Sequence, residues 1–144
     1  MKIAVAGVGY VGLVTAVTLA DVGHDVICLD VDKGKLKMLK EGISPIYEYG
    51  LEELMLKNRE RLEFTDDVTK YSEAQVIIIG VGTPEKEDGS ADLSAVFSVA
   101  DSIADNCSDG TVVVVKSTVP IGTCESVRRR IGCLLYTSPS PRDA

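Results

Sequence analysis

Three glycines and one carboxylate near the start of the chain have the types and spacing to hold a dinucleotide. Gly7, Gly9 and Gly12 follow a short apolar run, and Asp30 follows Gly12 by eighteen residues. In dinucleotide-binding βαβ units the first glycine permits the turn, the second leaves room for a pyrophosphate, and the third lets helix and strand pack closely. The acid accepts hydrogen bonds from a ribose diol. The pattern therefore predicts dinucleotide binding.

The surrounding sequence supplies the elements that must position these residues. Residues 3–6 read as a strand, residues 13–22 contain no Pro or Gly, and residues 25–30 read as a second strand that ends in the acid. A helix that opens at Tyr10 and Val11 offers unpaired N–H groups and a partial positive charge to a phosphate. Since glycine is common in turns, the alternative is a plain tight turn between strand and helix.

The carboxylate at the end of the second strand favours NAD over NADP. A 2′-phosphate at roughly 4 Å from Asp30 would cost about 1 kcal/mol in water and about 4 kcal/mol at an effective dielectric constant near 20. Such a cost is on the order of a ten- to thousandfold discrimination. Lys33 and Lys35 follow closely and would offset part of it by neutralising a phosphate.

Composition limits the class of protein. The chain has 144 residues, of which 45% are hydrophobic and 5% aromatic, and its formal net charge is −7 with a pI near 4.7. This length suits one domain, and the aliphatic balance suits parallel strands covered by helices. The negative charge argues against nucleic acid and anionic membranes as partners. The four cysteines lack metal-ligand spacing, which favours a reducing, cytoplasmic setting and predicts no metal site.

The two ends of the chain call for separate interpretations. The apolar stretch after Lys2 superficially resembles a secretion signal, but three glycines interrupt it and its removal would delete the first strand and helix. We expect residues 1–132 to be a dinucleotide-binding domain that is incomplete at its C-terminus. Residues 133–144 break the preceding pattern and resemble a reading frame of a transposase sequencing adaptor, so we expect a foreign tail. A Pro/Ser-rich linker is the alternative.

Strand and helix patterns alternate along the rest of the chain. The alternation predicts an α/β fold, a Rossmann-type doubly wound parallel sheet with strand order 3-2-1-4-5. Ligands bind such sheets beyond the carboxyl ends of the strands, where the first and fourth strands lie side by side. Further helices are expected at residues 33–41, 51–58, 94–106 and 122–131, and strands at 62–64, 76–79 and 112–115, the last two buried on both faces.

Two further loops are expected at this edge of the sheet. Thr83 and Pro84 follow the fourth strand, where small neighbouring residues let the chain pass beside a cofactor. Ser117 and Thr118 follow the fifth strand and place two hydroxyls near the expected position of a nicotinamide. The alternative for Ser117 and Thr118 is simple capping of the next helix.

These loops complete a resemblance to the UDP-glucose/GDP-mannose dehydrogenase family. The matching segments occur in the family's order and span residues 1–132, and their joint occurrence is specific. Tyr49 is a departure, because the family usually has Pro at this position. The segments are Met1–Gly12, Pro45–Leu54, Thr83–Pro84, Asp88–Ser94 and Lys116–Thr123.

The resemblance implies a two-step, NAD-dependent oxidation of a nucleotide-sugar primary alcohol to a carboxylate. It places Val11, Asp30 and Lys35 on the adenosine and pyrophosphate side of NAD, Thr83 along the cofactor, and Thr118 as a catalytic group near the reacting carbon. It also implies a homodimer and a nucleophilic cysteine, both in a later region that this chain does not contain. The residues that we predict to bind the cofactor are Gly7, Gly9, Tyr10, Val11, Gly12, Asp30, Lys35, Thr83, Pro84, Ser117 and Thr118.

Several alternatives stay open. The substrate could be UDP-glucose, GDP-mannose or a UDP-N-acetylhexosamine, because the sugar pocket lies downstream. The 3-hydroxyacid and 6-phosphogluconate dehydrogenases share the opening fold, but residues 45–54 and 88–94 disfavour them. A non-catalytic NAD-binding module is the rival from another class. We expect the fragment to bind NAD weakly, to catalyse nothing, and to aggregate through the edge of residues 112–115.

Overall fold

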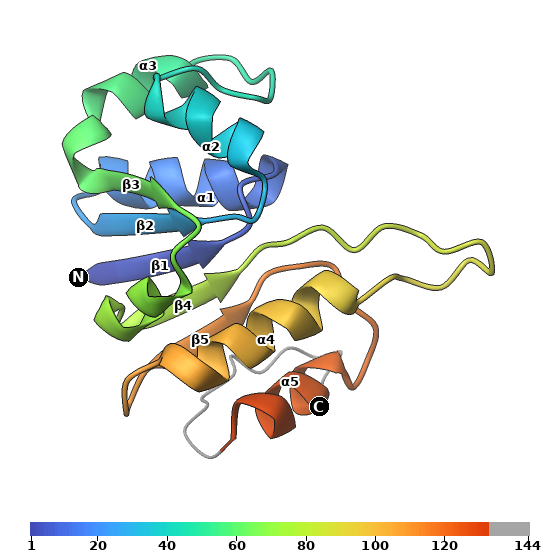
Figure 1. Ribbon diagram of the computed structural model, residues 1–144. Coiled ribbons are helices and arrows are strands. Elements are labelled where there is room, and N and C mark those ends of the chain that lie inside the picture. The colour runs from blue at the N-terminus through green and yellow to red at the C-terminus, as the bar shows by residue number, and fades with distance from the viewer. Residues whose placement is uncertain (133–144) are drawn as a thin grey trace.

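The computed structural model describes residues 1–132, and the expected foreign tail, 133–144, lies outside the described residues. Five parallel strands form one sheet in the order β3-β2-β1-β4-β5, which confirms the predicted doubly wound topology (Figure 1). The strands are β1 (Lys2–Ala6), β2 (Asp25–Leu29), β3 (Leu62–Thr65), β4 (Val76–Ile79) and β5 (Val112–Val115).

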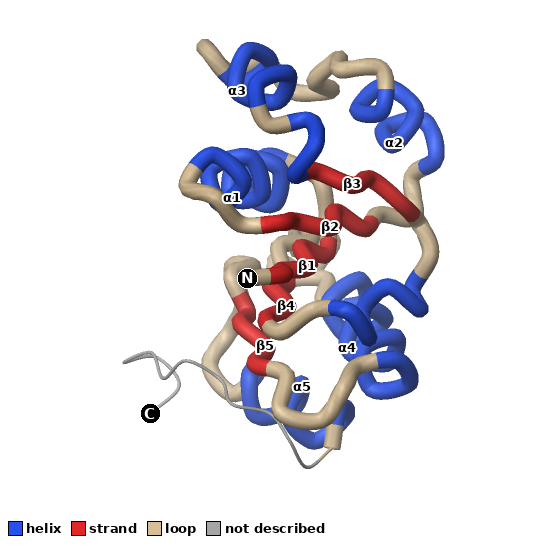
Figure 2. The backbone as a smooth tube through the Cα atoms, turned by 90° about the vertical axis from the view of Figure 1, so that its left-hand side faces the viewer, coloured by secondary structure: helices blue, strands red, loops and turns tan. Residues whose placement is uncertain are grey.

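Helices cover both faces of this sheet (Figure 2). Alternate residues of β1 enter different cores, as a period of two requires: Ile3 and Val5 join one cluster, and Ala4 and Ala6 the other. The first cluster packs under α1 and α3, and the second under α4, α5 and η2. The helices are α1 (Tyr10–Asp21), α2 (Lys33–Lys40), α3 (Leu51–Lys57), α4 (Ser94–Asn106) and α5 (Thr123–Ile131), with short 3-10 helices η1 (Arg59–Arg61) and η2 (Val68–Glu73).

Burial of the last strand differs from the expectation. Val113 is buried, but Val112, Val114 and Val115 are only half-buried. The prediction that this strand is buried on both faces is therefore wrong for the described residues, in which β5 pairs with β4 alone. The prediction is also wrong for β4, in which Val76 and Ile78 are only half-buried although the strand lies inside the sheet. An apolar run identifies a strand but does not tell how fully helices cover each face of the sheet.

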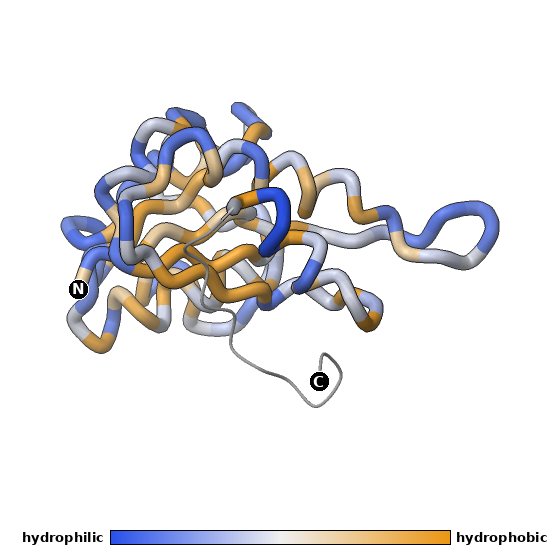
Figure 3. Tube along the Cα trace, turned by 90° about the horizontal axis from the view of Figure 1, so that it is seen from below, coloured by the Kyte–Doolittle hydropathy of each residue, from blue (hydrophilic) through white to orange (hydrophobic). Residues whose placement is uncertain are grey.

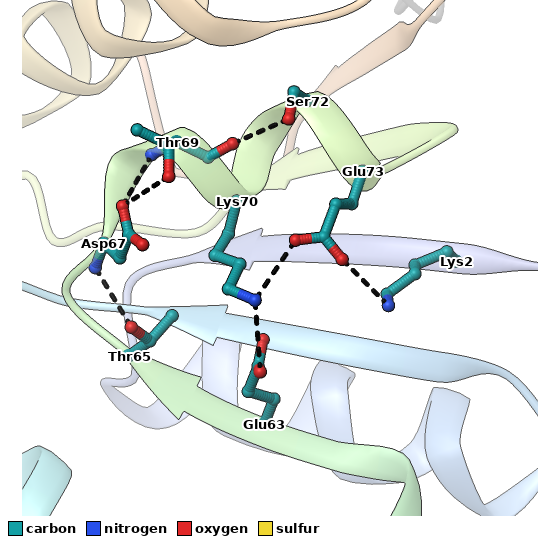
Figure 4. Close-up of polar contacts among 8 residues, drawn as sticks. All are labelled: Lys2, Glu63, Thr65, Asp67, Thr69, Lys70, Ser72 and Glu73. Carbon is teal, nitrogen blue, oxygen red and sulfur yellow. Dashed lines mark hydrogen bonds and ion pairs between the residues drawn. The ribbon is translucent and has the colours of Figure 1, made fainter.

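The 3-10 helix η2 was not predicted, and polar contacts hold it against the sheet (Figure 4). Asp67 begins it by accepting hydrogen bonds from the backbone N–H and hydroxyl of Thr69. Lys70 forms ion pairs with Glu73 at 3.2 Å and with Glu63 of β3 at 3.6 Å. The network continues from Glu73 to Lys2 of β1 at 3.2 Å. It thus joins η2 to two strands.

An arm formed by residues 84–92 extends from the body between β4 and α4, and its tip is hydrophilic (Figure 3). The backbone N–H of Asp92 donates to the carbonyl of Pro84 at 2.7 Å and closes the arm at its root. The backbone N–H of Lys86 donates to the carbonyl of Ser90 at 2.7 Å, and Gly89 makes the turn with a φ of 86°. Within residues 1–132, no helix has the length and apolar character needed to cross a membrane.

Candidate functional site

Two of the three glycines in the first turn are required by the fold itself. Gly7 has a φ of 99°, and a Cβ added there would lie 2.9 Å from backbone atoms of Val81. A Cβ on Gly12 would collide with the carbonyl of Gly7. The turn is further held by a 2.7 Å hydrogen bond from the N–H of Gly7 to the carbonyl of Leu29. These glycines let α1 start directly against the ends of β1 and β4.

Gly9 is different, because the protein gives no reason for its lack of a side chain. Its φ of −72° and ψ of −163° suit any residue, and an added Cβ would meet no atom within 4 Å. Gly9 is the N-cap of α1, and no side chain caps this end. The first helical hydrogen bond runs from Leu13 to Gly9, so the N–H groups of Tyr10 and Val11 lack helical partners. Open space therefore lies beside donors suited to an anion.

Asp30 is held next to this turn. Its Oδ2 accepts a hydrogen bond from the N–H of Val8 at 2.9 Å, and its Oδ1 accepts one from Asp32 at 2.8 Å. The N–H of Asp30 donates to the carbonyl of Thr65 at 3.3 Å, which ties the acid to β3 as well. The carboxylate thus has a fixed position at the carboxyl ends of β1 and β2, as the spacing predicts.

A pocket of about 160 Å³ opens beside Asp30 on the α4 side of the sheet. Tyr71 of η2 lies in its wall and is only 2% exposed. Burial, and then the charge of Asp30, raise the pKa of Tyr71, so its hydroxyl stays protonated. No sequence pattern predicts this pocket, because its walls come from distant segments. It is lined by Ala6, Gly7, Leu29, Asp30, Val31, Asp66, Val68, Tyr71, Val81, Ala95, Ser98, Val99 and Ser102.

The loops after β4 and β5 are joined by two side-chain hydrogen bonds. Thr83 Oγ1 donates to the carbonyl of Thr118 at 2.7 Å, and Ser117 Oγ donates to the carbonyl of Val81 at 2.7 Å. The capping alternative is therefore wrong for Ser117. The N-cap of α5 is Gly122, and no side chain caps that helix. The threonine and serine hydroxyls set the spacing of the two loops instead.

Two further residues that were predicted to bind the cofactor, Pro84 and Lys35, lie in segments next to these loops and to Asp30. Pro84 begins the arm, and Lys35 lies in the first turn of α2, where its N–H donates to Asp32, the neighbour that also bonds Asp30. Within residues 1–132 the Lys35 ammonium forms no ion pair, so it is free to meet an anion. The structure therefore groups the glycine turn with Asp30, and Thr83 with Thr118. The loops after β1 and β4 leave the sheet at the same end (Figure 1).

Side chains suited to other chemistry lie elsewhere. Cys28 is fully buried in β2, and burial raises the pKa of its thiol far above the ordinary value. Burial also raises the pKa of Cys107 at the end of α4. Neither thiol is therefore activated as a nucleophile. Among residues 1–132, no group of three or more His, Cys, Asp or Glu side chains is placed to hold a metal ion.

Comparison with known proteins gives one family. Residues 1–133 match the model of the UDP-glucose/GDP-mannose dehydrogenase family, NAD binding domain. A UDP-glucose 6-dehydrogenase of Rhizobium meliloti (strain 1021) is 52% identical over 135 residues, covering 91% of this chain and 31% of the relative. The UDP-glucose 6-dehydrogenase YwqF of Bacillus subtilis (strain 168) is 51% identical over 126 residues, covering 85% of this chain and 29% of the relative.

Solved structures agree with this match. A ternary complex of a GDP-mannose dehydrogenase from Pseudomonas aeruginosa superposes with a TM-score of 0.88 at 36% identity, covering 95% of this chain and 35% of that one. A UDP-D-ManNAc dehydrogenase from Pyrococcus horikoshii gives 0.89 at 31% identity, with the same coverage. The chain spans about a third of the length of the relatives it matches.

Proposed function

The chain belongs to the UDP-glucose/GDP-mannose dehydrogenase family, and we propose that residues 1–132 serve as the NAD-binding domain of an enzyme that oxidises UDP-glucose to UDP-glucuronate in two NAD-dependent steps. The match of residues 1–133 to the family's NAD-binding domain supports the cofactor. The 52% identity to a UDP-glucose 6-dehydrogenase supports the choice of sugar. The site observation that carries the proposal is the open space at Gly9, beside an uncapped helix end and a fixed carboxylate.

The described residues fit NAD along the whole edge of the sheet. The space at Gly9 and the free N–H groups of α1 suit the pyrophosphate, since a helix N-terminus attracts anions. Asp30 suits the diol of the adenosine ribose, and the mostly apolar pocket beside it suits a planar base. Thr83 and Thr118, joined at 2.7 Å, lie toward the nicotinamide end in this arrangement. When bound, NAD supplies the hydride acceptor.

The protein's own residues would then bind NAD, orient it and select it over NADP. Asp30 accepts hydrogen bonds from a ribose diol, and its charge disfavours a 2′-phosphate. The resemblance to the family implies that Thr118 has a catalytic role near the nicotinamide end, and the hydrogen bond from Thr83 holds the backbone of Thr118 in place. The nucleophilic cysteine and the sugar pocket belong, in this proposal, to the part of the relatives that the chain does not span. The chain alone should bind NAD without turnover.

A GDP-mannose or UDP-N-acetylmannosamine substrate is the second candidate. Its support is the superposition, at TM-scores of 0.88 and 0.89, on dehydrogenases of those two classes. The sequence identity of 52% and 51% to UDP-glucose enzymes favours the first candidate. We further propose a cytoplasmic enzyme that forms a homodimer through regions outside residues 1–132.

Calorimetric titration of the 144-residue chain with NAD tests the proposal. We expect a single weak binding event with one NAD per chain. A chain that is folded by circular dichroism, but releases no heat with millimolar NAD, would overturn the assignment of the site. A second titration with NADP, under the same conditions, should give weaker binding because of the charge on Asp30.

A further inference from the structure

The segment between α2 and α3 has no role in the proposed function, yet its tip is bonded to the phosphate-binding helix. The hydroxyl of Tyr10, the first residue of α1, donates to Oε2 of Glu48 at 2.8 Å. Tyr10 is 56% exposed and Glu48 is exposed as well, so burial in the core does not explain the contact. This segment lies at the same end of the sheet as the glycine turn (Figure 1).

The base of the segment is fixed without this bond. The N–H of Ser44 donates to Glu52 at 3.0 Å, and the hydroxyl of Ser44 donates to the carbonyl of Ile46 at 2.7 Å. Ile46 packs against the core under α1, and Gly50 turns the chain into α3 with a φ of 78°. Glu48 therefore stands on a preformed turn, and its bond to Tyr10 adds orientation at the tip rather than stability of the fold.

The bond has a direct consequence at the open end of α1. A carboxylate only accepts hydrogen bonds, so it fixes the Tyr10 hydroxyl as a donor and holds the ring in one orientation. The hydrogen bond to Glu48 also raises the pKa of Tyr10, which keeps the hydroxyl protonated. The backbone N–H of Tyr10 is one of the helix-end donors without a helical partner. The bond thus links the Tyr10 ring and these donors to residues 44–50.

We propose that Glu48 is a positioning residue for the pyrophosphate: through Tyr10 it holds residues 44–50 against the first turn of α1 as one side of the phosphate site. This inference rests on the proposed function. A carboxylate near bound phosphates would by charge alone weaken their binding. The sign of the effect therefore separates positioning from simple repulsion, because loss of a positioning bond weakens binding whereas loss of a repelling charge strengthens it.

The test compares ligands with and without phosphates on the full 144-residue chain. Adenosine, ADP and NAD are titrated, by ligand-observed NMR, into the unchanged chain and into Glu48→Ala, Glu48→Gln and Tyr10→Phe. Glu53→Ala is the charge control, from the first turn of α3, and Tyr47→Phe is the hydroxyl control, since Tyr47 is 99% exposed. Both substitutions at Glu48 remove the charge, but glutamine keeps an acceptor for the Tyr10 hydroxyl.

We expect Glu48→Ala and Tyr10→Phe each to weaken ADP and NAD binding about three- to tenfold, the loss of one hydrogen bond that orders the site. Adenosine binding should stay unchanged, and Glu48→Gln should lose less ADP affinity than Glu48→Ala. A double variant that combines Glu48→Ala with Tyr10→Phe should bind ADP no more weakly than the weaker of the two single variants. Equal losses for adenosine and ADP, tighter ADP binding by both Glu48 variants, or unchanged ADP binding would each overturn the proposal. An unchanged chain that binds neither ADP nor NAD would instead overturn the proposed function.

Discussion

The carboxylate of Asp30 accepts a hydrogen bond of 2.9 Å from the backbone N–H of Val8, so the acid after β2 is joined to the glycine turn after β1. Asp32 donates to the other carboxylate oxygen at 2.8 Å. The acid and the turn are therefore assembled before any ligand arrives. Each oxygen of a carboxylate has two lone pairs, so both remain able to accept a hydrogen bond from a ribose.

Substitution of Asp30 should separate its structural and selective roles. Asp30→Asn removes the charge and keeps an acceptor for one of the two backbone N–H groups that Asp30 binds, so it should narrow the NAD/NADP preference on the order of tenfold with a smaller loss of stability than alanine. Asp30→Ala should narrow it as well and also lower the free energy of unfolding by about 1–3 kcal/mol, because the Val8 N–H loses its partner. Calorimetry with both cofactors and thermal melts measure the two effects. Asp25→Asn, at the other end of β2, is the control; an unchanged NAD/NADP ratio in Asp30→Asn would exclude Asp30 as the discriminator.

Alanine at Gly9 and at Gly12 should have opposite consequences. Gly9→Ala places its methyl group in open space, so the melting temperature should hold or rise while NAD affinity falls by roughly tenfold or more. Gly12→Ala forces a methyl group into the carbonyl of Gly7 and should cost about 3 kcal/mol or more. Thermal denaturation and NAD titration of both variants provide the comparison. A Gly9→Ala variant that binds NAD normally would show that the space at Gly9 is not part of the site.

Removal of the Thr83 hydroxyl should act at one end of the cofactor. Thr83→Val loses the 2.7 Å bond to the Thr118 carbonyl, with an expected stability loss of about 0.5–1.5 kcal/mol. We expect weaker NAD binding with unchanged AMP binding, since neither Thr83 nor Thr118 lines the pocket beside Asp30. Thr83→Ser retains the hydroxyl and should behave like the unchanged chain. Equal weakening of AMP binding and NAD binding would show that Thr83 does not act at the nicotinamide end.

The ion pairs below η2 should make stability depend on pH. Hydrogen bonds with Lys2 and then Lys70 lower the pKa of Glu73 below its ordinary 4.5. A carboxylate with a depressed pKa in the folded state stabilises above its unfolded pKa and loses that contribution as the pH falls through the folded pKa. The melting temperature of the unchanged chain should therefore exceed that of Glu73→Gln at neutral pH, and the gap should close below about pH 4.5.

Ionic strength and a matched control variant test whether the ion pairs of Glu73 cause this gap in melting temperature. The gap should shrink as ionic strength rises, because the four side chains are partly exposed. Glu60→Gln is the control, since Glu60 forms no ion pair within residues 1–132 and should show no such gap. A gap that did not begin to shrink as the pH falls below the ordinary pKa of 4.5 would contradict a role for the charge of Glu73.

The sequence was sufficient for the features whose causes are local. Glycine spacing and two apolar runs predict β1, α1 and β2, and the bounds of α4 and β5 agree with residues 94–106 and 112–115. The position of Asp30 follows from the same spacing. Order of the strands follows from the alternation of elements, since right-handed crossovers restrict the topology.

Features that depend on distant residues could not be predicted. The pocket beside Asp30 joins Val31, Tyr71 and Ser102, which no spacing rule connects. The bond from Ser117 to Val81 depends on how two loops approach, and hydroxyl residues before a helix more often suggest a cap. Val112 and Val114 are half-buried, as are their partners Val76 and Ile78 in β4, so the exposure reflects how helices cover that face of the sheet, which a run of four valines does not encode.

The arm at residues 84–92 contributes no side chain to either hydrophobic cluster of the domain. Its root is closed by the bond from Asp92 to Pro84, and residues 85–90 beyond it are exposed. Exchange of the tip therefore changes little of what stabilises the core. A reporter peptide inserted at Gly89 would therefore lie at the tip of the arm, away from the hydrophobic cores. This makes the arm the natural point of attachment for a probe.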